Sequence, residues 1–257
     1  MHCTKNAIEL QGLRYRYGDG TLALDDVTLL LRHEERTAML GPNGAGKSTL
    51  LGHLNGITRA QEGSVFIEDE LVTGANLAEV RRKVGLVFQD PDDMLFMTSV
   101  RDDVAFGPLN GGVSGAELSA RVDAALAAVG VAELADKPGG HLSFGQKKRA
   151  AMAAVLAMEP AILVLDEPTS NLDPRARRRM IDLIKGLDIT FFVATHDLDF
   201  AWELCERSVI LDAGRIVADG PTRELLADAE LMQAHGLEVP TLALLGALDE
   251  KVCHRNK

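Results

Sequence analysis

Cysteine and positive charge are both scarce in this sequence. The three cysteines, Cys3, Cys205 and Cys253, are far apart and form no Cys-x-x-Cys pair. This spacing argues against a disulfide framework or a cysteine zinc site, and reduced thiols are expected. Lys and Arg total 27 against 38 Asp and Glu, which gives a formal net charge of −11. Because proteins that bind nucleic-acid backbones carry basic faces, we expect no nucleic-acid partner.

Long apolar runs are absent as well. The most apolar stretch, 150–165, is interrupted by Glu159 and Pro160 and falls short of the roughly 18 residues that a membrane-spanning helix needs. Residues 1–6 are polar and lack the apolar core of a signal peptide, so no secretory signal is expected. Any association with a membrane should therefore go through a partner protein.

What the sequence does contain is a phosphate-binding pattern, G-x-x-x-x-G-K-[ST], at 41–49. Residues 37–40 before it resemble a short buried strand, and 48–54 after it place leucines at helical spacing. These flanks favour the motif over an ordinary strand-to-helix turn. Glycine N–H groups and the positive helix end would bind phosphate oxygens, while Lys47 would reach the β- and γ-phosphates and the Ser48 hydroxyl would bind Mg²⁺. The expected nucleotide contacts are Gly41, Pro42, Asn43, Gly44, Ala45, Gly46, Lys47, Ser48 and Thr49.

Polar residues also follow two further apolar segments. Residues 161–165 suit a central parallel strand that delivers Asp166 and Glu167 to its carboxyl end, where ligands collect in α/β sheets. We expect Asp166 to hold Mg²⁺, directly or through water, and Glu167 to face an attacking water. His196 follows the predicted strand 191–194. A histidine at that place is often structural, but its position beside two other motif-bearing strand ends favours contact with the γ-phosphate.

The remaining pattern predicts a β-rich beginning and an inserted helical region. Residues 8–17 and 27–31 are typical of strands, and 63–72 of a hairpin. From 90 to about 148 strand signals vanish, which indicates a helical subdomain inserted in an α/β core. From about 222 onward we expect helix and then irregular chain without chemistry.

Two stretches stay ambiguous on local evidence. Tyr17 could stack on a purine base, although aromatic residues in edge strands usually serve packing. Residues 142–146 lead into a helix expected to begin near Lys147, and Ser143 at such a start could help to bind an anion. A plain capped helix is the simpler interpretation of this second stretch.

Over residues 7–225, these features resemble the nucleotide-binding subunit of an ATP-binding-cassette (ABC) transporter. The motifs follow the family's order: Walker A at 41–49, the Q-loop at Gln89, the signature at 142–146, Walker B at 162–167, the D-loop at 170–173 and the switch histidine at His196. The resemblance implies an α/β P-loop NTPase core of RecA-like type, with an N-terminal antiparallel β subdomain and an inserted α-helical subdomain. The expected segments are 1–89 for the β subdomain and first part of the core, 90–148 for the helical subdomain, 149–225 for the rest of the core and 226–257 for a C-terminal helical extension.

The same resemblance implies a set of functional residues. Tyr17 falls where the family has its base-stacking aromatic, which makes that role the expected one. The implied catalytic residues are Glu167, His196, Lys47 and Gln89, the implied Mg²⁺ ligands are Ser48, Gln89 and Asp166, and ATP contacts are implied for Tyr17, residues 41–49, Ser143, Gly145 and Gln146.

Three positions depart from the family's pattern. Phe144 occupies the third place of a signature that is usually Leu-Ser-Gly-Gly-Gln, Asn171 replaces a small D-loop residue, and Glu34 stands where a turn glycine is common. We expect signalling across a dimer and the geometry of that turn to be affected, and the residues that contact phosphate to be unaffected.

Residues 87–96 and 103–110 narrow the resemblance to the ATPases of energy-coupling-factor importers, especially those for cobalt and nickel. The variant Leu-Ser-Phe-Gly-Gln-Lys-Lys-Arg also fits that group. The resemblance implies a head-to-tail dimer with a second ATPase subunit, identical or paralogous. It also implies a membrane coupling protein, a substrate-capture membrane protein and a peripheral place on the cytoplasmic face of the cell membrane. The seven histidines are scattered, as expected if the transported metal never touches this chain.

Several other functions remain open at this point. A vitamin-type energy-coupling-factor importer or a soluble cassette ATPase of iron–sulfur assembly would share the same motifs. A DNA-repair or translation cassette protein is disfavoured because the chain is acidic and lacks long coiled-coil insertions or a second cassette. A regulatory role without hydrolysis is disfavoured by the presence of Lys47, Asp166, Glu167 and His196.

Overall fold

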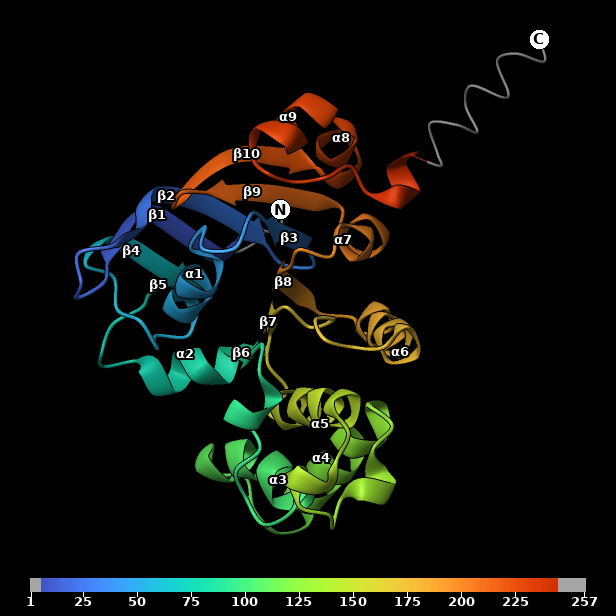
Figure 1. Cartoon of the computed structure of the whole chain (residues 1–257). Helices are drawn as coiled ribbons and strands as arrows, with labels where there is room; N and C mark the ends of the chain where they lie inside the picture. Colours follow the sequence, from blue (N-terminus) through green and yellow to red (C-terminus); the bar gives the residue numbers. More distant parts are fainter. Residues whose placement is uncertain (1–5, 245–257) are drawn as a thin grey trace, which may run out of the picture. The chain divides into compact units, whose positions relative to one another are not determined.

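The computed structural model describes residues 6–244, which divide into two compact units. One unit comprises residues 6–72 and 190–244 of the described chain, and the other is Thr73–Ile189. The second unit is therefore inserted, in sequence, between two parts of the first. Figure 1 traces the chain through both.

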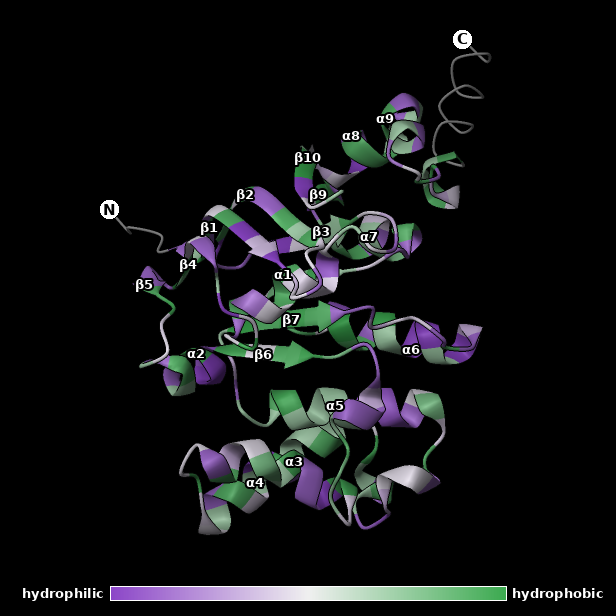
Figure 2. Ribbon diagram, turned by 60° about the vertical axis from the view of Figure 1, so that its left-hand side comes forward, coloured by the Kyte–Doolittle hydropathy of each residue, from purple (hydrophilic) through white to green (hydrophobic). Residues whose placement is uncertain are grey.

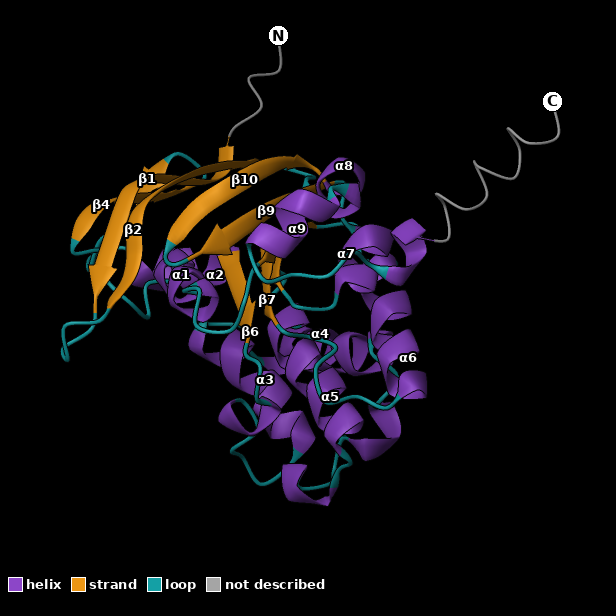
Figure 3. Ribbon diagram, turned by 45° about the horizontal axis from the view of Figure 1, so that its top comes forward, coloured by secondary structure: helices purple, strands orange, loops and turns teal. Residues whose placement is uncertain are grey.

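The first unit begins with an antiparallel sheet, as expected. Its strands lie in the order β2-β1-β4-β5, with β1 at Asn6–Arg16, β2 at Leu22–Arg32, β4 at Glu62–Ile67 and β5 at Glu70–Leu71. The partial alternation of apolar and polar residues gives β1 one buried face, which includes the fully buried Leu10. Figure 3 shows β1, β2 and β4 as one curved layer.

A second set of strands in this unit is largely parallel. In the order β10-β9-β3-β8, it consists of β10 at Arg215–Pro221, β9 at Arg207–Asp212, β3 at Arg36–Leu40 and β8 at Thr190–Ala194. β3 runs parallel to both β8 and β9, and β10 pairs antiparallel with β9. Every residue of β8 is buried, in keeping with the apolar run that follows Thr190.

The helices of the same unit include α1 at Lys47–Leu54, α7 at Leu198–Leu204, α8 at Thr222–Ala227 and α9 at Ala229–Ala234. Residues 241–244 are helical as well. The helical character expected from about residue 222 is present in α8 and α9. The rest of the predicted extension, residues 245–257, lies outside the described residues, as do Cys3 and Cys253.

The second unit combines two parallel strands with helices. β6 at Val84–Val87 pairs with β7 at Ile162–Asp166, and both strands are strongly hydrophobic in Figure 2. The helices are α2 at Leu77–Lys83, α3 at Val100–Asn110, α4 at Gly115–Ala128, α5 at Phe144–Leu156 and α6 at Pro174–Lys185, with short 3-10 turns at Pro91–Asp93, Ala132–Leu134 and Gly139–His141. The described part of 90–148 contains no strand, in agreement with the inserted helical subdomain.

Two element boundaries differ from the expectations. β2 starts five residues before the predicted strand 27–31. Helix α5 starts at Phe144 rather than near Lys147, because Ser143 and Gln146 form a capping box that begins the helix three residues earlier. The expected segment boundary at residue 148 consequently falls inside α5.

Gly85 offers a test of how α5 packs on β6. A Cβ atom at this position would lie 2.3 Å from Val155 Cγ1 and 2.9 Å from Pro160 Cγ. Gly85→Ala should therefore lower the free energy of unfolding by about 1–3 kcal/mol through overpacking. Urea denaturation of the variant measures the loss. Gly140→Ala is the matched control, because a Cβ at Gly140 meets nothing within 4 Å. Equal stability of the two variants would contradict the close contact.

Candidate active site

The loop between β3 and α1 has a backbone that depends on glycine. Gly41, Gly44 and Gly46 have φ angles of +149°, +80° and +105°, which favour glycine over other residues. Space is restricted too, since a Cβ on Gly46 would lie 2.4 Å from the Ala23 carbonyl oxygen. A Cβ on Gly41 would come within 2.0 Å of the Leu211 carbonyl oxygen. The loop can thus present its backbone N–H groups at the start of α1, as phosphate binding requires.

Lys47, the first residue of α1, is buried beneath this loop. Its Nζ donates hydrogen bonds to the carbonyl oxygens of Gly41 at 2.7 Å and Pro42 at 3.0 Å. The neighbouring Ser48 is exposed, so its hydroxyl can reach a ligand from solvent. A fixed cation, glycine-shaped backbone and an accessible hydroxyl together fit a phosphate group with Mg²⁺.

Tyr17 lies against the same loop and helix. Its hydroxyl is 2.5 Å from Thr49 Oγ1, and 45% of the residue is exposed. Its ring meets Tyr15 edge to face at 5.3 Å between centroids, and Tyr15 meets His53 in the same way at 5.0 Å. Burial lowers the pKa of His53, which favours a neutral ring in this cluster. The cluster therefore holds an exposed aromatic ring beside the loop.

His196 follows the strand next to β3. Met39 of β3 is in register with Ala194 of β8, and Thr195 N donates to the Met39 carbonyl oxygen at 3.1 Å. Because the two strands are parallel, His196 and the phosphate loop leave the sheet at the same edge. Asp197 caps α7 by accepting a hydrogen bond from Phe200 N. Within the first unit, the structure thus brings Tyr17, the phosphate loop and the end of β8 together.

The second unit places two acidic residues and Gln89 at another pair of strand ends. Val87 of β6 is in register with Leu165 of β7, so Gln89 and Glu167 each lie two residues beyond that pair. Gln89 is exposed, whereas Asp166 and Glu167 are only 7% and 6% exposed. Glu167 has a φ of +48°, in the left-handed region that is uncommon for residues with a side chain.

The signature residues form the start of α5 in the same unit. Ser143 Oγ accepts from Gln146 N at 3.4 Å, and Ser143 N donates to Gln146 Oε1 at 2.8 Å. Gly145 packs closely, since a Cβ there would lie 3.0 Å from Ala176 Cβ. The helix start thus has the capped form that the simpler interpretation of 142–146 expected. It opens on a pocket of about 350 Å³ lined by Ser143, Phe144, Gly145, Gln146, Arg149, Asn171, Leu172, Asp173, Arg175, Ala176 and Arg179.

Sequence reasoning missed one buried polar contact in this unit. Lys148 is 3% exposed, and its Nζ donates to the Glu167 carbonyl oxygen at 2.5 Å and to Ser170 Oγ at 3.0 Å. Burial lowers the pKa of Lys148 to about 8, against the opposing effect of the carboxylates of Glu167, Asp166 and Asp90.

A signal for this contact is present in the sequence. Lys148 lies three, four and seven residues before Ala151, Met152 and Val155, all of which are buried. A lysine on the apolar stripe of a helix indicates either a chain that reaches the surface or a buried partner. Only the structure distinguishes the two.

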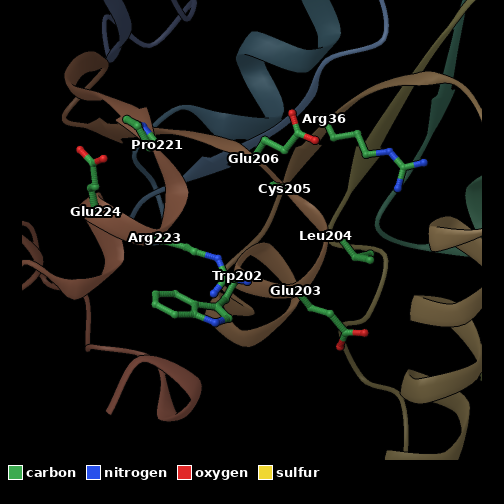
Figure 4. Close-up of a pocket in the computed structure, with 9 residues that line it drawn as sticks. All are labelled: Arg36, Trp202, Glu203, Leu204, Cys205, Glu206, Pro221, Arg223 and Glu224. Atoms are coloured by element: carbon green, nitrogen blue, oxygen red, sulfur yellow. The ribbon is translucent and has the colours of Figure 1, made fainter. Parts of the chain in front are cut away.

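A separate pocket of about 540 Å³ lies in the first unit and shares no residue with the phosphate loop. In Figure 4 three of its charged side chains, Arg36, Glu203 and Glu224, point apart, and Arg223 lies over the Trp202 ring at 5.1 Å from the centroid. Because these groups do not converge on one point, the pocket offers no ligand set.

The phosphate loop, the signature and the end of β7 all lie in a region that matches a known protein family. The family model described as "ABC transporter" matches residues 24–170, more than half of the chain. The chain belongs to the ABC transporter family. A protein of Streptomyces coelicolor with the broad name ABC transporter ATP-binding protein is 56% identical over 91% of this chain and 90% of the relative. The energy-coupling factor transporter ATP-binding protein EcfA of Carboxydothermus hydrogenoformans is 48% identical over 93% of this chain and 89% of the relative.

Solved structures of ABC proteins share the fold. CbiO1 of Clostridium perfringens, part of the ABC transporter complex CbiONQ, matches 95% of this chain and 99% of that chain with a TM-score of 0.79 and 38% identity. A dimeric ATP-binding cassette with ADP and phosphate, captured after hydrolysis, matches 84% of this chain and 98% of that one, with a TM-score of 0.76 and 28% identity. The P-loop fold with an N-terminal antiparallel sheet and a helical insert is confirmed.

Membership of the ABC transporter family establishes the reaction that this chain catalyses. The chain is an ATPase that uses ATP with Mg²⁺ and couples hydrolysis to transport. Among residues 6–244, no helix has the length and apolar character to cross a membrane. The same part of the chain holds no group of three or more His, Cys, Asp or Glu arranged for a metal ion. Mg²⁺ in ATPases commonly relies on few protein ligands because phosphate oxygens and water supply the others.

The phosphate loop of this ABC protein can be tested through Gly46. Gly46→Ala places a Cβ against the Ala23 carbonyl oxygen and strains a left-handed backbone, so the loop must shift. We expect ATP affinity to fall at least about tenfold, since the loop's N–H groups would no longer converge on phosphate. Titration with a fluorescent ATP analogue measures the change. Gly220→Ala serves as control, because its neighbours lie at 3.8 Å or more. Unchanged affinity in Gly46→Ala would show that the loop geometry is not needed.

Proposed function

We propose that this chain is the ATP-hydrolysing subunit of an energy-coupling-factor importer for cobalt or nickel ions. The supporting observation is similarity along nearly the whole chain to relatives named EcfA, together with the fold shared with CbiO1. The residues at 87–96 and 103–110 support the same importer group. The metal ion is the cargo of the complex, and this chain supplies the energy.

The proposed active unit contains two ATPase subunits. The chain carries one Walker A loop and one signature, so a head-to-tail pair would bind each ATP between the loop of one subunit and the signature of its mate. A related cassette has been solved as a dimer. In this arrangement Ser143, Gly145 and Gln146 would complete the ATP site of the partner subunit. The pocket beside these three residues would face the partner's nucleotide. ATP would then stabilise the closed dimer only until hydrolysis and release.

Each candidate residue has a role consistent with its surroundings. Lys47 would neutralise charge on the phosphates, and Tyr17 would stack on the base. Ser48, Gln89 and Asp166 would hold Mg²⁺, which supplies positive charge against the phosphoryl group during transfer. The Glu167 carboxylate would orient a water and accept its proton, while His196 and Gln89 would contact the γ-phosphate.

The proposed docking surface for the membrane coupling protein lies on the second unit. Phe96 and Phe106 are both exposed and meet edge to face at 5.1 Å between ring centroids, with Met97 and Leu109 also exposed. The backbone at Phe96 and Met97 is fixed by α3, since Asp103 Oδ1 accepts hydrogen bonds from Phe96 N and Met97 N. Exposed apolar side chains on a fixed backbone are typical of a protein-binding surface. Such docking would place the chain on the cytoplasmic face of the membrane, as a peripheral subunit.

Glu167→Gln tests the proposed chemistry. The amide keeps the shape of the side chain but cannot accept a proton from water, so turnover should fall by about 10²–10⁴-fold. ATP binding should persist, and size-exclusion chromatography with ATP should show an increased dimer fraction. Full hydrolysis by this variant would remove Glu167 from the role of base.

Phe96→Ala combined with Phe106→Ala tests the docking surface. The chain is expressed together with the membrane proteins encoded by adjacent genes, and the membranes are sedimented. Loss of the aromatic pair should reduce the amount of the chain that sediments with these membranes. ATP binding by the purified chain should be unchanged. Leu71→Ala is the control, since Leu71 is an exposed apolar residue on the other unit. Undiminished membrane association of the double variant would refute this surface, and a chain that never sediments with membranes would favour a soluble cassette ATPase.

The cargo is tested by uptake in cells that express the whole complex. Radioactive cobalt or nickel should accumulate with the wild-type chain and not with Lys47→Ala, because that variant lacks the phosphate-binding ammonium. Uptake of a vitamin in place of either metal would overturn the metal assignment and leave the ATPase role intact.

A further inference from the structure

Lys148 connects the signature helix to the backbone of the proposed catalytic residue. It lies on α5, four residues after Phe144, and its ammonium contacts two acceptors at the end of β7. One acceptor is the carbonyl oxygen of Glu167, and the other is the hydroxyl of Ser170. Ser170 Oγ also donates to the Glu167 carbonyl oxygen at 2.9 Å, so the three groups form a closed triangle.

The surroundings make a simple packing role a poor explanation for this lysine. An ammonium group is costly to bury, and an apolar side chain of similar size usually serves stability as well or better. Nearby, the Phe144 ring lies 5.7 Å from the Nζ atom and covers it on one side. The free-energy cost of burial is thus offset by contacts made largely with the segment that begins at Glu167.

That segment needs external support. Glu167 has a φ of +48° and Asn171 one of +60°, both in the left-handed region. A residue with a side chain stays in that region only when its environment holds it there. Ser170 N donates to the Glu167 carbonyl oxygen at 3.2 Å, and Lys148 holds the same oxygen from the helix side.

We propose that Lys148 is a positioning residue for ATP hydrolysis, because it fixes the Glu167 backbone and thereby the place of the Glu167 carboxylate. The inference rests on the proposed role of Glu167 as the group that activates water. Lys148 itself touches neither nucleotide nor water in this role. Because Lys148 is on the helix that begins with the signature, a movement of α5 would be passed directly to Glu167.

Lys148→Met tests the proposal. The methionine is one atom shorter than lysine but keeps most of the bulk of the side chain and removes the donors, so the Glu167 carboxylate should be less well placed. We expect kcat for ATP hydrolysis to fall by about 10–100-fold, as for displacements near 1 Å, with KM for ATP changed less than about twofold. Lys147→Met is the matched control, since the Lys147 ammonium pairs with Asp92 at 2.6 Å and does not contact Glu167. The control should keep wild-type kcat.

A second measurement separates positioning from general damage to the fold. In single-turnover assays, Lys148→Met should cost nothing further in a Glu167→Gln background, because both changes act through the same carboxylate. An equal additional loss in that background would overturn the proposal. Wild-type kcat in Lys148→Met would do the same. Should the methionine variant not fold, Lys148→Gln replaces it. The glutamine side chain is one bond shorter than lysine, so its amide cannot reach both acceptors.

The Glu167→Gln variant tests the proposed base separately from the positioning role of Lys148. If Glu167→Gln retains full turnover, the proposed base is wrong and the role of Lys148 falls with it. If Glu167→Gln is inactive while Lys148→Met folds and keeps wild-type kcat, only the positioning role fails.

Discussion

Parallel strand pairing is the constraint on which the candidate active site depends. Neighbouring parallel strands end at one edge, so the backbone pairing by itself brings together the residues that follow them. β3 and β8 do this for the phosphate loop and His196, and β6 and β7 do it for Gln89 and the acidic pair. The largely buried and mostly apolar strands supply stability, and polar residues lie at or just beyond their carboxyl ends.

Helix α5 carries a disproportionate share of the second unit's organisation. Its first turn is the signature, its Gly145 allows close approach to Ala176, and Val155 near its other end packs over Gly85. Lys148 adds a polar contact to the end of β7. Contacts near both ends and in the middle of α5 thus tie this helix to α6, β6 and the end of β7.

Much of the fold and of the candidate site was predictable from sequence because the relevant signals are local. The glycine-rich loop after β3 and the apolar strands each depend on a few adjacent residues, and both are observed. The contacts of Lys148 and the Tyr17–Thr49 pair join residues far apart in the chain, and no periodicity encodes them. The expected start of α5 near Lys147 is three residues late, because the glycine-containing stretch before it resembles a loop while Ser143 and Gln146 form the capping box that begins the helix at Phe144.

The hydroxyl contact between Tyr17 and Thr49 bears on the proposed stacking of Tyr17 on a base. A free surface tyrosine samples several rotamers and loses that entropy when a ligand arrives. Here the ring is already tethered to the phosphate loop and braced by Tyr15. In the proposed stacking role this entropy would already be lost on folding, so an incoming purine would meet a preordered ring and more of the stacking energy would remain as affinity.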